Sequence, residues 1–318
     1  MTIRLSLSIA LASYNGERYI REQLDSIANQ TRLPDELVVS DDASVDSTIA
    51  IIEDFARSAP FPIHLRVNGE RLGTLNNFEA AIRACRGDII FLCDQDDVWY
   101  TDKVALIEEH FSDPKIGAVF SDGDVVDQNL HPFDRLWKVF KFSLKEQDMI
   151  SAGNALGVLL KHSVVTGATL AFRSNYRDLV LPLPDLPETW HDEWIALLIG
   201  ATSSLVALRT PLIAYRQHGS NQVGIRKKNK DTSPATIYGP RVMRVEAARM
   251  RLLENADSFS TDDRIIKSLD GALAFLHSCA ALPRSRWRRL PCALRELAAL
   301  RYHRYARGLK SFRKDLLR

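Results

Sequence analysis

Three carboxylates lie within four residues of the sequence, in the stretch CDQDDVW at positions 93–99. They are Asp94, Asp96 and Asp97, and they directly follow the apolar run 89–92. Carboxylates this close repel one another unless a cation or strong hydrogen-bond donors compensate them. The cluster is therefore either a solvated surface turn or a site for a hard divalent cation such as Mg²⁺ or Mn²⁺.

Two earlier polar groups occupy comparable positions in the chain. The apolar stretch 5–12 leads into Ser-Tyr-Asn-Gly, and the stretch 36–40 leads into Asp41 and Asp42. A single polar turn of this kind is common in any protein. Three of them, each directly after an apolar stretch, favour one shared site.

The elements that must position these groups follow a regular alternation. The sequence predicts strands over residues 5–12, 36–40, 63–67 and 88–92, and helices over residues 19–30, 46–55 and 75–84. Nearly continuous apolar strands that alternate with helices are typical of a largely parallel sheet covered on both faces. Ligands bind beyond the carboxyl ends of the strands in such sheets, so the three polar groups should converge on one edge.

The loops after these strands lack two common phosphate-binding motifs. Neither GxGxxG nor GxxxxGK[ST] follows any predicted strand, which disfavours a Rossmann dehydrogenase and a P-loop NTPase. A diphosphate can instead be held through a divalent cation that bridges carboxylate and phosphate oxygens. The acidic strand ends favour this second arrangement.

Composition is that of an ordinary soluble protein. The 318 residues are 46% hydrophobic and 26% charged, and no apolar run approaches the ~20 residues that span a bilayer. The N-terminal segment reads as a buried first strand rather than a signal peptide. The four cysteines lack metal-binding or disulfide-framework spacing, so a reducing cytosol is expected.

Seven segments together carry a family resemblance. In chain order they are ALASYNGERYIREQLDSI, ELVVSDDASVDST, GTLNNFEAAI, FLCDQDDVW, VTGATLAF, TWHDEW and YRQHGSN. They resemble inverting family 2 glycosyltransferases, especially bacterial rhamnosyltransferases, over roughly residues 5–225. The resemblance implies an α/β fold of the GT-A (Rossmann-like) type, with a mixed, mainly parallel sheet flanked by helices in residues 1–225. Residues 226–318 would form a basic helical extension.

The resemblance assigns a donor side to the site. It implies that nucleotide and donor are bound by Ala12, Tyr14, Asp41, Asp42, Asn76, Asp94 and Arg216. Either Asn76 or its neighbour Asn77 would border the pocket. Carboxylates suit this role because they accept hydrogen bonds from a pyrimidine N3–H or ribose hydroxyls.

The resemblance also implies a divalent cation, Mg²⁺ or Mn²⁺, with Asp96 as its principal ligand. Asp97 would have a supporting role. His218 would either complete the metal shell or donate to the leaving diphosphate, at which Arg216 adds charge.

The segment TWHDEW carries the candidate base. Asp192 in isolation could simply match the dipole of the helix that begins there. The resemblance implies instead a single displacement, in which an acceptor hydroxyl attacks the anomeric carbon and a carboxylate takes its proton. Asp192 is the candidate for that role.

Three further residues are expected on the sugar or acceptor side. They are Trp99, Gly167 and His191. Trp99 could equally pack in a core, and Gly167 could serve only a tight strand entry. His191 departs from the family, because many relatives carry Glu at that position.

The C-terminal region differs in charge from the rest. Residues 281–318 contain twelve Lys and Arg against two acids, and Leu, Trp and Tyr are interleaved with the arginines. After a predicted break at Gly239-Pro240, helices are expected over 242–256 and 265–280. The basic stretch suits an amphipathic helix on an anionic bilayer, or an appendage that packs on its own domain or a dimer mate. Nucleic acid is disfavoured because the remainder of the chain is acidic.

The predicted function follows from the resemblance. The protein would transfer a sugar, best L-rhamnose from dTDP-rhamnose, to a hydroxyl of a cell-surface or lipid-linked glycan. It would act in the cytoplasm, peripherally on the inner face of the cell membrane. The alternatives are a sugar-nucleotide nucleotidyltransferase, for which SYNGERY lacks the glycine-rich basic loop, and an inactive glycan-binding scaffold, against which Asp96 and Asp192 argue.

Overall fold

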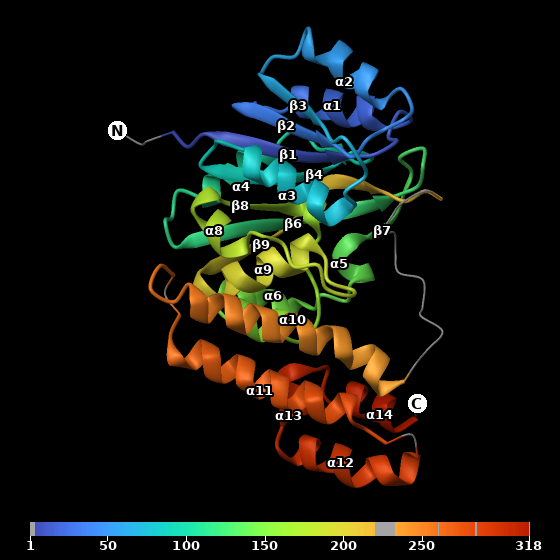
Figure 1. Cartoon of the computed structure of the whole chain (residues 1–318), viewed down its shortest axis with the longest axis vertical. Coiled ribbons are helices and arrows are strands. Elements are labelled where there is room, and N and C mark those ends of the chain that lie inside the picture. Colours follow the sequence, from blue (N-terminus) through green and yellow to red (C-terminus); the bar gives the residue numbers. More distant parts are fainter. Residues whose placement is uncertain (1–3, 220–232, 260, 284, 318) are drawn as a thin grey trace.

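The computed structural model describes residues 4–219, 233–259, 261–283 and 285–317. These residues build one nine-stranded sheet in the order β3-β2-β1-β4-β8-β6-β9-β5, with β7 paired to β6 off this path. Figure 1 shows helices on both sides of the sheet and a separate layer of C-terminal helices beside it.

The N-terminal half has the predicted strand and helix alternation. Its strands are β1 (Leu7–Ser13), β2 (Glu36–Asp41), β3 (Ile63–Val67) and β4 (Ile89–Asp94), and its helices are α1 (Ile20–Ala28), α2 (Thr48–Ala56) and α3 (Thr74–Ala84). The four strands are parallel, with β1 between β2 and β4. β1, β2 and β4 are buried almost throughout, as their apolar runs require.

The second half makes the sheet mixed. It contains β5 (Val98–Trp99), α4 (Lys103–His110), β6 (Ile116–Val126), β7 (Pro132–Arg135), α5 (Leu136–Val139), α6 (Leu144–Ser151), α7 (Ala155–Leu159), β8 (Leu170–Arg173), α8 (Arg177–Val180), α9 (His191–Thr202) and β9 (Ser204–Arg216), with 3₁₀ turns at Gly167–Thr169 and Ser174–Tyr176. β8 runs antiparallel between β4 and β6, and β9 pairs parallel to β6 and antiparallel to β5. The predicted α/β class with a mixed sheet is confirmed.

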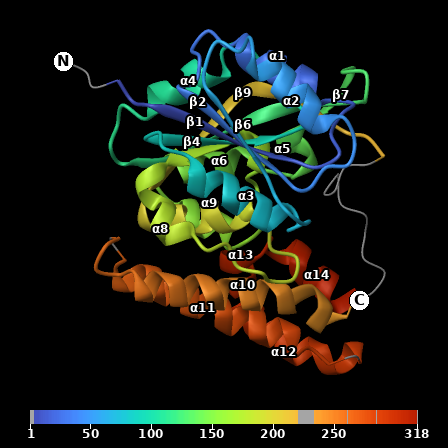
Figure 2. The same cartoon turned by 45° about the horizontal axis from the view of Figure 1, so that its top comes forward.

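The C-terminal segment is helical, as predicted. It consists of α10 (Pro234–Glu254), α11 (Asp263–Ala280), α12 (Arg286–Ala298), α13 (Arg301–Tyr305) and α14 (Leu309–Leu317). Figures 1 and 2 show α10 between the body of the protein and α11. The predicted break at Gly239-Pro240 is wrong, because Pro240 lies inside α10. Ser233 caps this helix and Pro234 opens it, and a longer helix tolerates the one backbone bond that Pro240 removes.

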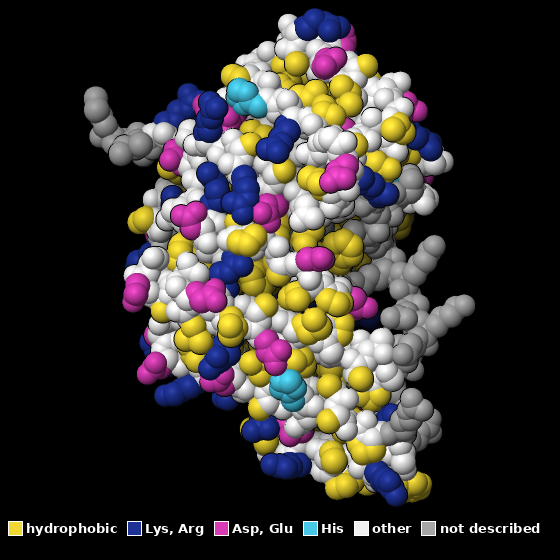
Figure 3. Space-filling model, viewed as in Figure 1, with side chains coloured by type: hydrophobic (Ala, Val, Ile, Leu, Met, Phe, Trp, Pro, Cys, Tyr) yellow, Lys and Arg dark blue, Asp and Glu magenta, His cyan; other side chains and the backbone are white. Residues whose placement is uncertain are grey.

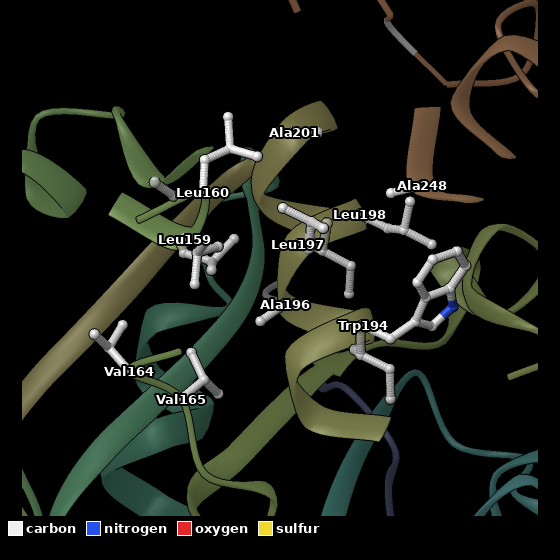
Figure 4. Packing of buried hydrophobic residues seen from close by; sticks show 14 of the residues in the cluster. Leu159, Leu160, Val164, Val165, Trp194, Ala196, Leu197, Leu198, Ala201 and Ala248 are labelled. Carbon is white, nitrogen blue, oxygen red and sulfur yellow. The ribbon is translucent and has the colours of Figure 1, made fainter. Parts of the chain in front are cut away.

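One hydrophobic cluster joins the extension to the body. It contains Trp194 on α9 and Ala248 on α10, whose packing Figure 4 shows. The Trp194 indole donates to Val180 O at 2.8 Å, and Arg251 on α10 donates to Leu179 O at 3.0 Å. The predicted division at residue 225 stays a prediction, because it falls outside the described residues. No helix in the described parts of the chain is long and apolar enough to cross a membrane.

Candidate active site

A cavity of about 990 Å³ opens at the carboxyl ends of β1 and β4. This volume lies at the upper end of what ligand sites usually have. Nine of the predicted site residues line it: Ala12, Tyr14, Asp42, Asp94, Asp96, Gly167, His191, Asp192 and His218. The strand ends and the start of α9 thus meet in one place.

The structure separates two pairs of neighbouring residues that were predicted for the donor side. Asp41 is fully buried, and its carboxylate accepts from the Ser13 and Ser44 hydroxyls, so it stabilises the loop after β2. Asp42 is the neighbour that lines the cavity. Asn76 is exposed, donates to Leu72 O just before α3 begins, and is not among the described residues that line the cavity.

Of the two asparagines considered for this position, Asn77 is the one at the cavity wall. It lines the cavity, is 2% exposed, and donates to Ser40 O at 2.9 Å and Ser13 O at 3.2 Å. Its amide therefore ties the ends of β1 and β2 together at the cavity wall.

Trp99 and Arg216 do not belong to the described wall of the cavity. The Trp99 indole packs in the core against Phe91 and lies under the Lys103 ammonium, 3.7 Å from the ring centre. Arg216 is 1% exposed and donates to Asp96 O at 2.8 Å and Gln128 O at 2.8 Å. Both residues lie behind the acidic motif, and neither is among the described residues that line the cavity.

Hydrogen bonds fix the cavity wall around the ends of β1 and β2. The Gln95 side chain accepts from Tyr14 N at 2.8 Å and donates to Tyr14 O at 3.0 Å, which fixes the loop after β1. Asp42 accepts from the backbone of Leu72 and Gly73 at 2.6 and 2.9 Å. Arg71 lies over the Tyr14 ring, 4.1 Å from its centre. An aromatic ring, a guanidinium and a carboxylate here suit a nucleotide base and ribose.

Burial and mutual repulsion disfavour the ionised forms of the carboxylates in the acidic motif. Burial and the nearby Asp96 and Asp192 raise the pKa of Asp94 to about 7. Burial, with Asp96 and Asp94 beside it, raises the pKa of Asp97 well above its usual value, although Asp97 accepts from Arg216 N. Burial lowers the pKa of Lys103 to about 7. The cluster therefore favours a bound cation.

Asp96 and His218 form the candidate metal-binding pair. Their Oδ2 and Nε2 atoms are 2.8 Å apart, and the imidazole lies against the Tyr19 ring. No group of three or more His, Cys, Asp or Glu side chains suited to a metal exists in the described ranges. Two protein ligands nevertheless fit Mg²⁺ or Mn²⁺, which keep water and substrate phosphate in the remaining positions.

Asp192 lies in the first turn of α9. Its Oδ2 accepts from Gly167 N at 2.8 Å, and its Oδ1 accepts from Glu193 N at 2.7 Å. These bonds fix the carboxylate at the cavity wall. A carboxylate held in this way can take a proton from a bound hydroxyl.

His191 is a neutral, apolar part of the wall. Its ring stacks on Phe78 with centres 3.9 Å apart, and burial lowers its pKa to about 3. Neither ring nitrogen has a hydrogen-bond partner among the described residues. A Cβ on residue 167 would lie 2.5 Å from His191 Nε2, so Gly167 makes room for this ring.

Comparison with protein families gives the context of this geometry. Residues 8–175, a little over half of the chain, match the family model Glycosyl transferase family 2. The chain belongs to this family. Its dTDP-rhamnosyl transferase relative RfbG from Shigella flexneri is 39% identical over 229 residues, which cover 67% of this chain and 73% of the relative.

Other relatives extend the comparison. An uncharacterized protein from Mycobacterium tuberculosis is 39% identical over 104 residues, and this match spans 32% of the chain and only 30% of the relative. The structure of Staphylococcus aureus TarS in complex with UDP-GlcNAc has a TM-score of 0.56 at 19% identity, over 86% of this chain and 72% of that one. A mannosyltransferase from Pyrobaculum calidifontis, in complex with GDP-Man and Mn²⁺, has a TM-score of 0.50 at 22% identity, over 94% and 75%. Both structures share the fold.

Some cavity residues of this family 2 chain escaped the sequence analysis. Gln95 lies within the acidic motif, and its polar amide could have identified it as a candidate site residue. The wall residues Lys141, Lys161, Arg241, Arg244 and Arg307 belong to no motif. The last two residues of YRQHGSN, Ser220 and Asn221, lie outside the described residues.

Asp94→Asn should stabilise the protein increasingly as pH rises. The folded-state pKa of about 7 exceeds the unfolded value of ~3.9, so stability falls as pH rises through this window. An amide removes the penalty, and the variant's melting temperature should exceed the parent's by on the order of 2 °C at pH 8 and by less at pH 5. Thermal unfolding in EDTA measures this. Asp257→Asn, an exposed control, should show no pH trend, and a constant offset for Asp94→Asn would contradict the assignment.

Proposed function

We propose that this protein is a metal-dependent, inverting glycosyltransferase that transfers a sugar from a nucleoside diphosphate donor to a hydroxyl of a glycan. One observation carries the proposal. The cavity that is lined by the pair Asp96 and His218 is also lined by Asp192, which lies on α9. Transfer needs a diphosphate-binding end and a proton acceptor within reach of one sugar. The family membership and the nucleotide-sugar complexes of two neighbours in fold support it.

The chain's own residues would divide the donor between them. Asp42, Tyr14 and Asn77 would hold base and ribose, and Asp94 would accept from sugar or ribose hydroxyls. Asp96 and His218 would hold Mg²⁺ or Mn²⁺, which when bound neutralises charge on the leaving diphosphate. This end of the cavity would be held in position by three residues behind its wall, Asp97, Arg216 and Lys103.

The transfer itself would be one displacement. The acceptor oxygen forms a bond to the anomeric carbon while the bond from that carbon to the diphosphate oxygen breaks, and the hydroxyl proton passes to Asp192. Gly167 N holds that carboxylate in place. His191, neutral and stacked on Phe78, would offer the acceptor or donor sugar an apolar face.

L-Rhamnose from dTDP-rhamnose is the proposed donor sugar. The support is the 39% identity to the Shigella dTDP-rhamnosyl transferase over two thirds of the chain. The proposed acceptor is a cell-surface or lipid-linked glycan. A nucleotidyltransferase is less well supported, because the loop after β1 lacks a basic glycine-rich phosphate cradle, and an inactive scaffold would not need the compensated acid cluster.

An anionic membrane surface is the proposed partner of α12. Large apolar side chains of this helix face solvent, while two of its charged side chains are buried. Trp287 and Leu294 are 85% and 46% exposed, whereas Arg289 and Glu296 are each 4% exposed. Basic side chains flank the apolar ones, and Figure 3 shows yellow and dark blue atoms side by side at the lower end of the molecule, where α12 lies. This pattern fits a helix in the interface of an anionic bilayer, which would place the protein on the inner face of the cell membrane.

Asp192→Asn should lower turnover by about 10²- to 10⁴-fold while nucleotide affinity stays near that of the parent, and the melting temperature should fall only slightly, because the amide nitrogen cannot accept one of the two backbone hydrogen bonds. The amide keeps the shape of the carboxylate but cannot take the acceptor's proton. Released diphosphate in the presence of acceptor, nucleotide titration and thermal unfolding measure the three quantities. Asp185→Asn, an exposed carboxylate in the preceding loop, is the matched control. Parental turnover in Asp192→Asn would refute the role of base.

Asp96→Asn should abolish the dependence of nucleotide binding on Mn²⁺. Removing a carboxylate at the cavity surface costs little stability, so the melting temperature should hold. Nucleotide affinity is titrated with Mn²⁺ and with EDTA in the parent, in Asp96→Asn and in the exposed control Asp257→Asn. An Mn²⁺-dependent affinity in Asp96→Asn that equals the parent's would remove Asp96 from the metal site.

The double substitution Trp287→Ser and Leu294→Ser should weaken binding to anionic vesicles by about tenfold or more, since each large apolar side chain gains ~1.5–3 kcal/mol on full burial. Co-sedimentation with phosphatidylglycerol vesicles at low salt measures it. Phe133→Ser with Leu144→Ser removes exposed apolar side chains elsewhere, at 59% and 65% exposure, and should bind as the parent does. Equal binding by both doubles would show that another surface is responsible.

A further inference from the structure

A second charged region lies in the same cavity, away from the acidic strand ends. Lys141 and Lys161 line it from the body, and Arg241, Arg244 and Arg307 line it from the C-terminal helices. We call these five residues the basic wall. We propose that the basic wall binds a phosphate or diphosphate group carried by the acceptor. The assignment of this phosphate group to an acceptor rests on the function proposed above, whereas the presence of an anion site does not.

The arginines of the basic wall build the site. Arg307 Nη2 donates to Phe140 O at 3.2 Å and lies 3.0 Å from His162 Nδ1. Arg241 Nη2 donates to Leu160 O at 2.9 Å and to Lys161 O at 3.1 Å. The extension therefore joins two loops of the body, and each of these loops carries one of the two lysines.

The lysines supply uncompensated charge. Neither the Lys141 nor the Lys161 ammonium has a hydrogen bond or ion pair with any residue in the described ranges. Lys161 is half-buried and Lys141 exposed. Cations that share a concave wall raise the local concentration of anions. Phosphate oxygens are the acceptors that such a wall suits best.

The donor's own diphosphate does not account for this charge. That group belongs at the Asp96–His218 end, where a divalent cation compensates it. Two glutamates also line the cavity, Glu188 and Glu193, and Glu193 is already paired with Arg244, so five basic side chains face two acidic ones. The basic wall thus has a charge surplus that calls for a second anion. Its three arginines also lie outside residues 8–175, the part of the chain that matches the family model.

Two acceptor chemistries would present such an anion. One is a diphosphate that joins a glycan to its lipid carrier, and the other is a phosphodiester within the glycan. Both place phosphate oxygens beside the hydroxyl that is to be glycosylated.

Binding of inorganic pyrophosphate in EDTA tests the proposal. Without a divalent cation the acidic end repels the probe, so calorimetry reports on the basic wall. The parent should bind pyrophosphate, and Lys141→Gln with Lys161→Gln should weaken binding by about tenfold, equal to ~1.4 kcal/mol. Lys115→Gln with Lys145→Gln, two exposed lysines off the cavity, is the matched control. Asp96→Asn should bind at least as well as the parent.

The outcomes separate the possibilities. Pyrophosphate bound at least tenfold more tightly than inorganic phosphate supports the lipid diphosphate, and similar affinities support a phosphodiester. Parental binding by the Lys141 and Lys161 double variant, with its melting temperature unchanged, overturns the proposal, as does loss of metal-free binding in Asp96→Asn. Because no donor or turnover is involved, failure of glycosyl transfer would leave a positive result standing.

Discussion

The whole site depends on compensating three carboxylates that follow one buried strand. Asp94, Asp96 and Asp97 cannot all be ionised beside one another in a largely enclosed cavity. Two basic side chains are buried behind the motif. Lys103, on the first turn of α4, opposes the rise in the pKa of Asp94 and Asp97, whereas Arg216, at the end of β9, donates to Asp96 O and is paired with Glu22. A divalent cation on the cavity side, as proposed above, would complete the compensation of this charge.

The buried Lys103 also links the acidic motif to the candidate base. Lys103 Nζ donates to Ala168 O at 2.5 Å, and Gly167 N, one residue earlier, donates to Asp192 at 2.8 Å. The short turn at 167–169 is therefore held by an ammonium on one side and a carboxylate on the other. A change in charge at the acidic motif would be felt at Asp192 through one rigid turn. This coupling explains why a lysine is kept buried despite the cost that its lowered pKa reflects.

The sequence was sufficient for the features that repeat along the chain. Apolar runs predicted β1 to β4, and polar residues after those strands predicted Asp42, Asp94 and Asp96 in one cavity. Neighbouring residues could be told apart only in the three-dimensional structure. Asp41 and Asp42 are adjacent in the sequence, yet Asp41 faces the loop after β2 and Asp42 faces the cavity. Trp99 and Arg216 were misplaced because their partners, Lys103 and the Asp96 backbone, depend on tertiary packing. No local pattern could predict the basic wall, whose members come from four segments.

The positive charge of residues 281–318 illustrates the limit of reading charge from composition. Arg289 is buried and donates to Asp315 O at 3.0 Å, and Arg307 faces the cavity and holds two loops. Exposed arginines such as Arg288 and Arg295 flank the apolar face of α12. One basic segment therefore serves internal structure, the cavity wall and the outer surface. Its net charge alone could not assign these roles, because burial separates them and burial is set by which helices α12 and α14 pack against.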